Sequence, residues 1–231
     1  PLGAGHEGIG VAAAYYLKPS SDWFFPYYRD RSFCLQLGMT PYEQFLSAVA
    51  STEDPNSGGR QMPAHWGHRD LQIVSQSSPT ATQFNQAVGC AEAWRYIKGR
   101  KLPISHGEQE IAFVSSGEGA TSEGEFWEAV NVSANRKLPV FFLIEDNEYA
   151  ISVPVEVTTA GGDITKCFEG VPGLKTMQCD GTNLQESLQT CKNAVRHMRA
   201  GKGPVLMRAR VTRPYSHSLS DDQKTYRTSK E

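Results

Sequence analysis

The sequence predicts an α/β protein whose sheet is doubly wound and mostly parallel, and two observations support this fold class. Short apolar runs at residues 111–114 and 140–144 have the composition of strands that are buried on both faces. Between them, a segment from Ser122 to about Asn135 has the pattern of an amphipathic helix, and Ser122 with Glu125 has the spacing of a capping box. The apolar face of this helix consists of Phe126, Ala129, Val130 and Ala134. A strand–helix–strand unit of this kind builds a parallel sheet.

The segments on either side complete the predicted order of elements. We expect further helices at His6–Tyr16, Pro41–Ala50, Ser78–Tyr96 and Asn183–Arg199. We expect one more buried strand at Val205–Val211. The segment Ser20–Asp30, rich in aromatic and charged residues, is predicted to be a loop. Loops are also predicted for the segments rich in Gly, Pro or polar residues: Ser51–Trp66, Ser152–Gly173 and the stretch after Thr212.

The composition limits the domain organisation and the classes of function. A chain of 231 residues with 39% hydrophobic residues suits one sizeable domain. Its net charge of −2 gives no electrostatic reason to bind nucleic acid or an anionic membrane. No apolar run approaches the roughly 18 residues that span a bilayer.

The cysteines and the first residues indicate the compartment. The five cysteines are scattered without a CxxC spacing, so we expect reduced thiols rather than disulfides or a zinc site: Cys34, Cys90, Cys167, Cys179 and Cys191. The first residues do not have the pattern of a signal peptide. We therefore expect a cytoplasmic protein, or a protein of the mitochondrial matrix if its source is a eukaryote.

Two polar signals stand where the two central strands are expected to end. Gly117-Glu118-Gly119 follows the first strand, and Asp146-Asn147-Glu148-Tyr149 follows the second. Open α/β sheets bind ligands at the carboxyl ends of their strands, so we expect both signals at one site. The Glu118 carboxylate, the Asn147 amide oxygen and a nearby carbonyl are hard donors that suit Mg²⁺, which often shares its coordination shell with ligand phosphates. Gly117 and Gly119 would let a diphosphate approach the backbone closely, and amides of the following helix could donate to it. A solvated acidic turn beside a polar loop is the alternative interpretation.

This pair of signals resembles the thiamine diphosphate motif, and further blocks extend the resemblance over nearly the whole chain. The chain resembles the alpha subunit, or the alpha half of a fused alpha-beta chain, of the thiamine diphosphate-dependent component of 2-oxo acid dehydrogenase complexes. The blocks that resemble the family are Phe25–Asp30, Gly59–His65, Ser77–Gln83, Gly117–Gly119, Glu145–Pro154 and Ser216–Asp222. The Gly-Glu-Gly form, the Arg-Gln-Met-Pro block and Tyr149–Ser152 are most similar to the branched-chain (2-oxoisovalerate) dehydrogenase.

The resemblance implies a thiamine diphosphate-binding fold and a set of site residues. Metal ligation is implied for Glu118, Asn147 and the carbonyl of Tyr149, and diphosphate binding for the Tyr28-Arg29 pair, because a guanidinium suits phosphate oxygens. His217 matches a loop histidine that contacts the diphosphate and the reacting intermediate, so we expect it to be catalytic. The other implied cofactor contacts are Ser78, Thr80, Gly117, Gly119, Ala120 and Ile151.

Other matched positions have simpler alternatives. Ser77, Thr82 and Gln83 match a potassium site of branched-chain members, although Ser-Ser-Pro is equally suited to begin a helix. Ser218 matches a serine that kinases modify in some relatives, and a loop-stabilising hydroxyl is the favoured interpretation. For the Tyr28-Arg29 pair the alternative is an exposed aromatic and basic loop, and a loop histidine such as His217 is often merely solvated.

The chain also departs from the family pattern. Glu145-Asp146 stands where branched-chain relatives have Arg-Asn, so one diphosphate-binding cation is missing. Two carboxylates beside a diphosphate are costly unless they point away or face a cation. Ser216 replaces a second histidine. The chain begins and ends inside the usual alpha subunit, so we expect residues 1–231 to be one domain of a longer polypeptide, with residues 212–231 as a mobile active-site loop.

The resemblance implies oxidative decarboxylation of a 2-oxo acid, with branched-chain acids favoured, and transfer of the acyl group to a lipoyl carrier. In this family the glutamate that activates the pyrimidine comes from the beta subunit, and the sequence shows no candidate for it. The expected partners are a beta subunit or domain in an alpha2-beta2 type assembly, a lipoyl-bearing acyltransferase core and the 2-oxo acid itself. The alternatives are another thiamine-dependent 2-oxo acid or acetoin dehydrogenase component, a transketolase-like synthase, or a non-catalytic cofactor-binding half.

Overall fold

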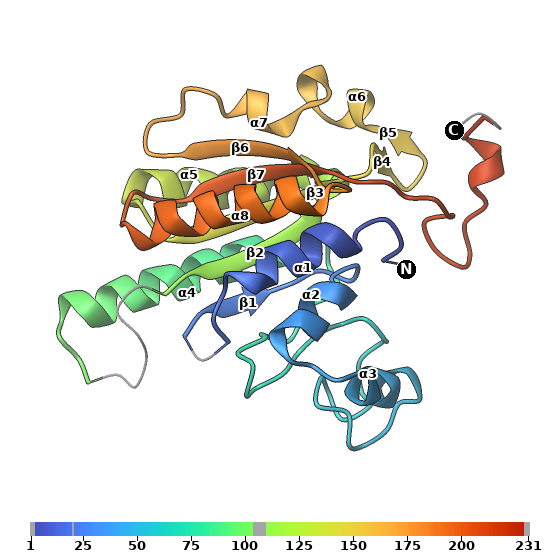
Figure 1. The fold of residues 1–231 in the computed structure, drawn as a ribbon, viewed down its shortest axis with the longest axis horizontal. Coiled ribbons are helices and arrows are strands. Elements are labelled where there is room, and N and C mark those ends of the chain that lie inside the picture. Colours follow the sequence, from blue (N-terminus) through green and yellow to red (C-terminus); the bar gives the residue numbers. More distant parts are fainter. Residues whose placement is uncertain (1–2, 20, 104–109, 229–231) are drawn as a thin grey trace.

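The computed structural model describes residues 3–19, 21–103 and 110–228 and has the predicted α/β architecture (Figure 1). One parallel sheet has the strand order β1-β2-β3-β7-β6. Its strands are β1 (Trp23–Phe25), β2 (Ala112–Gly117), β3 (Val140–Asp146), β6 (Lys175–Asp180) and β7 (Val205–Arg210). A small antiparallel hairpin follows β3 and consists of β4 (Tyr149–Ala150) and β5 (Val153–Pro154). Of the predicted segments, Ser20 and residues 229–231 lie outside the described residues.

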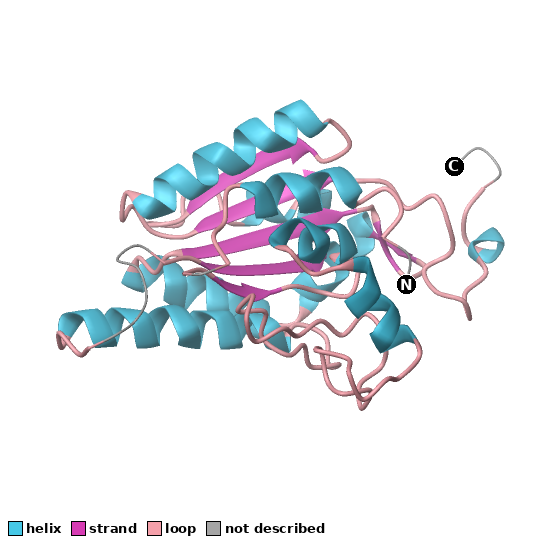
Figure 2. Cartoon of the chain, turned by 60° about the horizontal axis from the view of Figure 1, so that its bottom comes forward, coloured by secondary structure: helices cyan, strands magenta, loops and turns pink. Residues whose placement is uncertain are grey.

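Helices cover both faces of the sheet, as a doubly wound fold requires (Figure 2). One face packs against α1 (Glu7–Tyr15), α2 (Arg31–Leu37) and α8 (Leu184–Arg199). The other face packs against α4 (Thr82–Gly99), α5 (Gly124–Arg136) and α7 (Ile164–Cys167). The connections hold α3 (Pro41–Ala48), α6 (Val155–Thr158) and the 3₁₀ turns η1 (Glu118–Ser122), η2 (Ala160–Gly162) and η3 (Gln223–Thr225).

The sheet separates two apolar cores because successive strand residues point to opposite faces. On one side Phe113 of β2 stacks on Phe33 of α2, with 4.2 Å between ring centroids. On the other side Phe142 of β3 lies near Phe84 and Phe126. Since both faces are covered, β3 is buried along its whole length, which explains the continuous apolar run in the sequence.

The central strands pair in a register that sets Gly117 opposite Glu145. The connection between them contains α5, whose predicted apolar face, Phe126, Ala129, Val130 and Ala134, is buried. The two carboxyl ends therefore leave the sheet side by side. The elements predicted at His6–Tyr16, Pro41–Ala50, Asn183–Arg199 and Val205–Val211 are confirmed with small differences at their ends.

The predicted starts of two helices are wrong. The chain continues past β2 into η1, so α5 begins only at Gly124 and its N-cap residue makes no side-chain cap. Ser122, the predicted capping residue, instead lies with its hydroxyl 3.5 Å from the carbonyl oxygen of Thr158. The helix predicted from Ser78 begins at Thr82, because Ala81 adopts a left-handed backbone conformation with φ of 73°.

The sequence predicted neither the short hairpin β4–β5 nor two strands of the parallel sheet, and those two lie at its edges. β1 falls within the segment predicted to be a loop and is only three residues long. β6 pairs with β7 alone among the described strands and has mixed exposure instead of an apolar run. Edge strands of this kind lack the pattern that identifies central strands.

Two further findings concern composition. None of the helices that the structure describes is long and apolar enough to cross a membrane. The cysteines are all free thiols, of which Cys34, Cys179 and Cys191 are buried. Burial raises the pKa of the Cys179 thiol to about 12, which makes it a poor nucleophile.

The packing of Phe113 predicts a large loss of stability on truncation. Its fully buried ring contacts Phe33 and also lies edge-on to Phe141, so Phe113→Ala should lower the free energy of unfolding by about 3–5 kcal/mol. Urea denaturation followed by circular dichroism measures the change. The matched control is Phe45→Ala, because Phe45 is 70% exposed and its loss should change stability by about 0.5 kcal/mol or less. Similar losses in the two variants would contradict the assigned core.

Candidate cofactor site

A cavity of about 370 Å³ lies at the carboxyl ends of β2 and β3. This volume falls within the range of roughly 300–1,000 Å³ that is typical of small-molecule sites. The cavity is lined by every residue predicted to contact the cofactor: Tyr28, Arg29, Ser78, Thr80, Gly117, Glu118, Gly119, Ala120, Asn147, Tyr149, Ile151 and His217. The fold thus brings together residues from distant parts of the chain.

Glu118 occupies the turn directly after β2, and its side chain is buried. One carboxylate oxygen accepts a hydrogen bond from the Asn147 backbone N–H at 3.3 Å. Gly119 allows the close approach of β4 to this turn, since a Cβ atom at Gly119 would lie only 2.7 Å from the Ala150 Cβ. Burial, and secondly the nearby charge of Asp146, raises the pKa of Glu118 to about 7. A bound cation would stabilise the ionised form.

Asn147 follows β3, and its amide is incompletely satisfied. The Nδ2 atom lies 3.5 Å from Nε2 of His6. The Oδ1 atom is buried and has no hydrogen-bond partner. A buried acceptor without a partner costs free energy, and a cation in the cavity would remove that cost.

Arg29 and His217 meet at the wall of the cavity. The Arg29 guanidinium is buried and donates to Nδ1 of His217 at 3.3 Å and to its carbonyl oxygen at 3.4 Å. It also lies over the ring of Tyr28, 5.4 Å from the centroid. Burial, and secondly the Arg29 charge, lowers the pKa of His217 to about 4. The ring is therefore neutral, and because Nδ1 accepts from Arg29, Nε2 carries the hydrogen.

Arg213, in the segment after Thr212, does not line the cavity but holds the loop that does, and no sequence motif identified it. This buried guanidinium donates to the carbonyl of Ile151 at 2.8 Å and to that of Tyr149 at 3.4 Å. It also lies over the rings of Tyr149 and Tyr226. Arg213 therefore connects the C-terminal segment to the loop that contains the predicted carbonyl ligand. No local motif marks this arginine.

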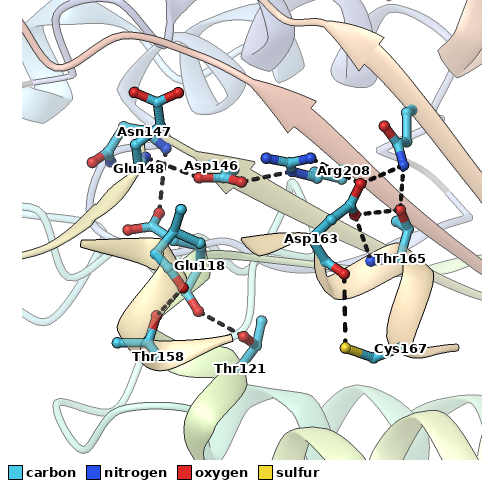
Figure 3. Close-up of polar contacts among 12 residues, drawn as sticks. Glu118, Thr121, Asp146, Asn147, Glu148, Thr158, Asp163, Thr165, Cys167 and Arg208 are labelled. Atoms are coloured by element: carbon cyan, nitrogen blue, oxygen red, sulfur yellow. Dashed lines mark hydrogen bonds and ion pairs between the residues drawn. The ribbon is translucent and has the colours of Figure 1, made fainter. Parts of the chain in front are cut away.

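Asp146 belongs to an ion-pair network that does not line the cavity (Figure 3). Its Oδ2 atom lies 2.6 Å from Nε of Arg208, which also lies 3.0 Å from Asp163. Its Oδ1 atom accepts the Glu148 backbone N–H at 2.9 Å, which orders the turn after β3. This carboxylate therefore faces a cation, which is one of the two conditions under which it would not disfavour a bound diphosphate.

Glu145 also lies outside the cavity lining and is fully buried. Its Oε2 atom is 2.6 Å from Nδ1 of His6 and accepts from the Tyr27 hydroxyl at 3.3 Å. Its carboxyl group also hydrogen-bonds that of Asp30. Burial and the neighbouring Glu145 raise the pKa of Asp30 well above its usual range, and burial raises the pKa of Glu145 to about 7, so the two carboxyl groups share a proton.

The positions predicted for a potassium ion lie close together. Ser77 and Gln83 line the cavity, and the hydroxyls of Ser77 and Thr82 hydrogen-bond each other. Gln83 donates through Nε2 to the Ser115 carbonyl at 3.2 Å. Among the residues that the structure describes, no three His, Cys, Asp or Glu side chains gather in a way that could hold a metal without further ligands. The candidate ligands Glu118 and Asn147 would thus suit an ion that completes its shell with phosphate oxygens.

The family described as "Dehydrogenase E1 component" matches residues 2–231 of this chain. The chain belongs to this family. The resemblance found in the sequence is thereby confirmed. The 2-oxoisovalerate dehydrogenase subunit alpha of Bacillus subtilis (strain 168) is 40% identical over 223 residues, or 96% of this chain and 64% of that protein. The mitochondrial subunit of the same name from Caenorhabditis elegans is 37% identical over 98% of this chain and 50% of its own length. The one from Dictyostelium discoideum is 34% identical over 98% of this chain and 49% of its own length. The chain therefore spans 49–64% of the length of these relatives.

The Asp146 network predicts a specific loss of stability. Arg208→Met should lower the free energy of unfolding by about 3–5 kcal/mol, because it leaves two acidic groups without their cation. Chemical denaturation measures this loss. Combining it with Asp146→Asn should recover part of the stability, because one unpaired charge is then removed. An Arg208→Met variant as stable as the wild type would show that the network contributes nothing.

Proposed function

We propose that this chain binds thiamine diphosphate with Mg²⁺ and is the alpha part of a 2-oxo acid dehydrogenase. With a beta-type partner it oxidatively decarboxylates a branched-chain 2-oxo acid and passes the acyl group to a lipoyl carrier. The observation that carries the proposal is the buried, unpartnered Oδ1 of Asn147 beside Glu118 at the wall of the cavity. Family membership and the names of the relatives support the dehydrogenase activity and the branched-chain substrate.

The residues at the two strand ends would hold the metal and the diphosphate. The Glu118 carboxylate, Asn147 Oδ1 and the Tyr149 carbonyl are the ligands that we assign to Mg²⁺. The Arg29 guanidinium and the Tyr28 side chain would bind the diphosphate. When bound, the cofactor supplies the carbon nucleophile and electron sink that decarboxylation requires.

The segment before α4 and the C-terminal segment would orient the rest of the cofactor and the substrate. Ser78 and Thr80 line the cavity where they could contact the aminopyrimidine, and Ser77, Thr82 and Gln83 are the proposed potassium site. His217 can donate from Nε2 to a diphosphate or substrate oxygen while Nδ1 accepts from Arg29. The neutral ring suits this role because it carries one hydrogen in a defined position.

A second polypeptide would complete the site. Glu118 and the exposed Glu123 are the glutamates among the described residues that line the cavity, and Glu118 is assigned to the metal. A glutamate in an apolar setting, which protonates the pyrimidine, would therefore come from a beta subunit or domain in an alpha2-beta2 type assembly. The acyl acceptor would be a lipoyl-bearing acyltransferase core.

The alternative of a non-catalytic half depended on Glu145 and Asp146. Both carboxylates have partners outside the cavity lining, so this reason for doubting cofactor binding no longer holds. Another thiamine-dependent 2-oxo acid or acetoin dehydrogenase component remains the second candidate, and substrate preference separates it from our proposal.

Removal of either assigned side-chain ligand should abolish metal-dependent cofactor binding. Glu118→Ala and Asn147→Ala should each weaken binding of thiamine diphosphate in the presence of Mg²⁺ by about 3 kcal/mol, or roughly 100-fold. Isothermal titration calorimetry measures the affinity. Glu123→Ala is the matched control, because this exposed glutamate also lines the cavity and has no assigned ligand role. Unchanged affinity in both ligand variants would rule out the metal assignment.

The isolated chain should not turn over 2-oxo acids, because general acid–base catalysis by the missing glutamate is worth ~10²–10⁴-fold in rate. We expect turnover only after reconstitution with the beta partner, with a higher kcat/KM for 2-oxoisovalerate than for pyruvate or 2-oxoglutarate. An assay with an artificial electron acceptor measures it. Full turnover by the isolated chain would disprove the proposal that a second polypeptide completes the site. Preference for another 2-oxo acid would disprove the branched-chain assignment.

A further inference from the structure

A row of buried side chains lies behind the unpartnered amide oxygen of Asn147. It begins at the Asp30–Glu145 carboxyl pair, continues through His6 and ends at Asn147. His6 precedes α1 and is far from the others in sequence, yet its ring is almost completely buried against both Glu145 and Asn147. Glu145 and Asn147 are two residues apart at the end of β3, so one ring can contact both.

Each hydrogen bond in this row has a defined direction. A carboxylate accepts hydrogen bonds and donates none, so Glu145 is the acceptor in its contacts with Tyr27 and His6. Its Oε2 atom accepts from the Tyr27 hydroxyl, and Nδ1 of His6 lies 2.6 Å from the same atom. Nδ1 of His6 therefore carries a hydrogen. A neutral imidazole with its hydrogen on Nδ1 has a lone pair on Nε2, and this atom accepts from Nδ2 of Asn147 at 3.5 Å.

This direction determines how the amide of Asn147 lies. The two ends of an asparagine amide have nearly the same shape, and only their hydrogen bonds distinguish them. With Nδ2 held by His6, Oδ1 must point the other way, where it has no protein partner. The reversed amide would set Oδ1 against the lone pair of Nε2 and would present hydrogens instead of an oxygen to a cation. Both contacts would be repulsive.

We propose that His6 is a positioning residue for the metal site, because it holds the amide of Asn147 with Oδ1 available to a divalent cation. This inference rests on the proposed function, and it adds a residue that no sequence motif identified. His6 does not contact the metal. Its role corresponds to that of the groups behind metal ligands in other proteins, whose loss typically weakens metal affinity by roughly 10–100-fold.

The test compares Mg²⁺ affinity in three forms of the 231-residue chain, titrated by calorimetry at saturating thiamine diphosphate. His6→Leu removes both hydrogen bonds and should weaken Mg²⁺ binding by roughly 10–100-fold. In His6→Gln the side-chain amide can donate to Glu145 and accept from Asn147, so affinity should stay within about threefold of the wild type. Equal losses in the two variants would overturn the proposal.

The same His6 substitution in an Asn147→Asp chain distinguishes positioning of the Asn147 amide from a general effect on the stability of the fold. Asn147→Asp replaces the amide with a carboxylate whose two oxygens are equivalent, so its orientation no longer needs to be set. Adding His6→Leu to Asn147→Asp should therefore cause no further loss of Mg²⁺ affinity. The same loss in both backgrounds would show that His6 acts only through the fold, and thermal unfolding without Mg²⁺ measures that contribution directly.

The outcomes distinguish this inference from the function on which it rests. A wild-type chain without Mg²⁺-dependent cofactor binding would overturn the proposed function and the role of His6 together. Wild-type binding with unchanged affinity in His6→Leu would overturn the role of His6 alone. Loss in His6→Leu, retention in His6→Gln and no added loss in the Asn147→Asp background would together support positioning.

Discussion

The parallel pairing of β2 with β3 is the constraint on which the candidate site depends. Both strands contain runs of apolar residues whose side chains are buried in the two cores on either face of the sheet, and polar groups gather where the strands end. The register sets Gly117 opposite Glu145, so Glu118 and Asn147 follow at the same edge of the sheet. The hydrogen bond from the Asn147 backbone to the Glu118 carboxylate is a direct result of that pairing. A slip of this register would separate the assigned ligands while leaving each sequence motif intact.

The same edge of the sheet contains several buried charges, and the structure balances them by different means. Asp146 is paired with Arg208, whereas Glu145 contacts the Tyr27 hydroxyl and the His6 ring and shares a proton with Asp30. Burial raises the pKa of Glu118, and the Asn147 amide oxygen lacks a partner. These two incompletely satisfied groups line the cavity. A buried polar group that lacks interaction partners costs free energy in a protein core. Such groups are expected where a ligand supplies the missing interaction.

The sequence predicted those features that have a local pattern. Apolar runs identified β2, β3 and β7 because these strands have neighbours on both sides, and the spaced motifs identified the residues that line the cavity. The edge strands β1 and β6 lack such runs and could not be predicted in this way. The contacts of His6 with Asn147 and of Arg213 with Ile151 join segments far apart in the chain, so no periodicity or motif indicates them. The predicted capping box at Ser122 failed because the turn η1 intervenes between strand and helix.

The central claim is that the ends of β2 and β3 hold a divalent metal together with a diphosphate. Anomalous diffraction from crystals grown with Mn²⁺ and thiamine diphosphate tests it most directly, because Mn²⁺ takes the same oxygen ligands as Mg²⁺. We expect one peak within coordination distance of the Glu118 carboxylate, Asn147 Oδ1 and the Tyr149 carbonyl, adjacent to the phosphates. A cofactor bound in the cavity with no metal at these ligands, or with the metal held by other residues, would contradict the account.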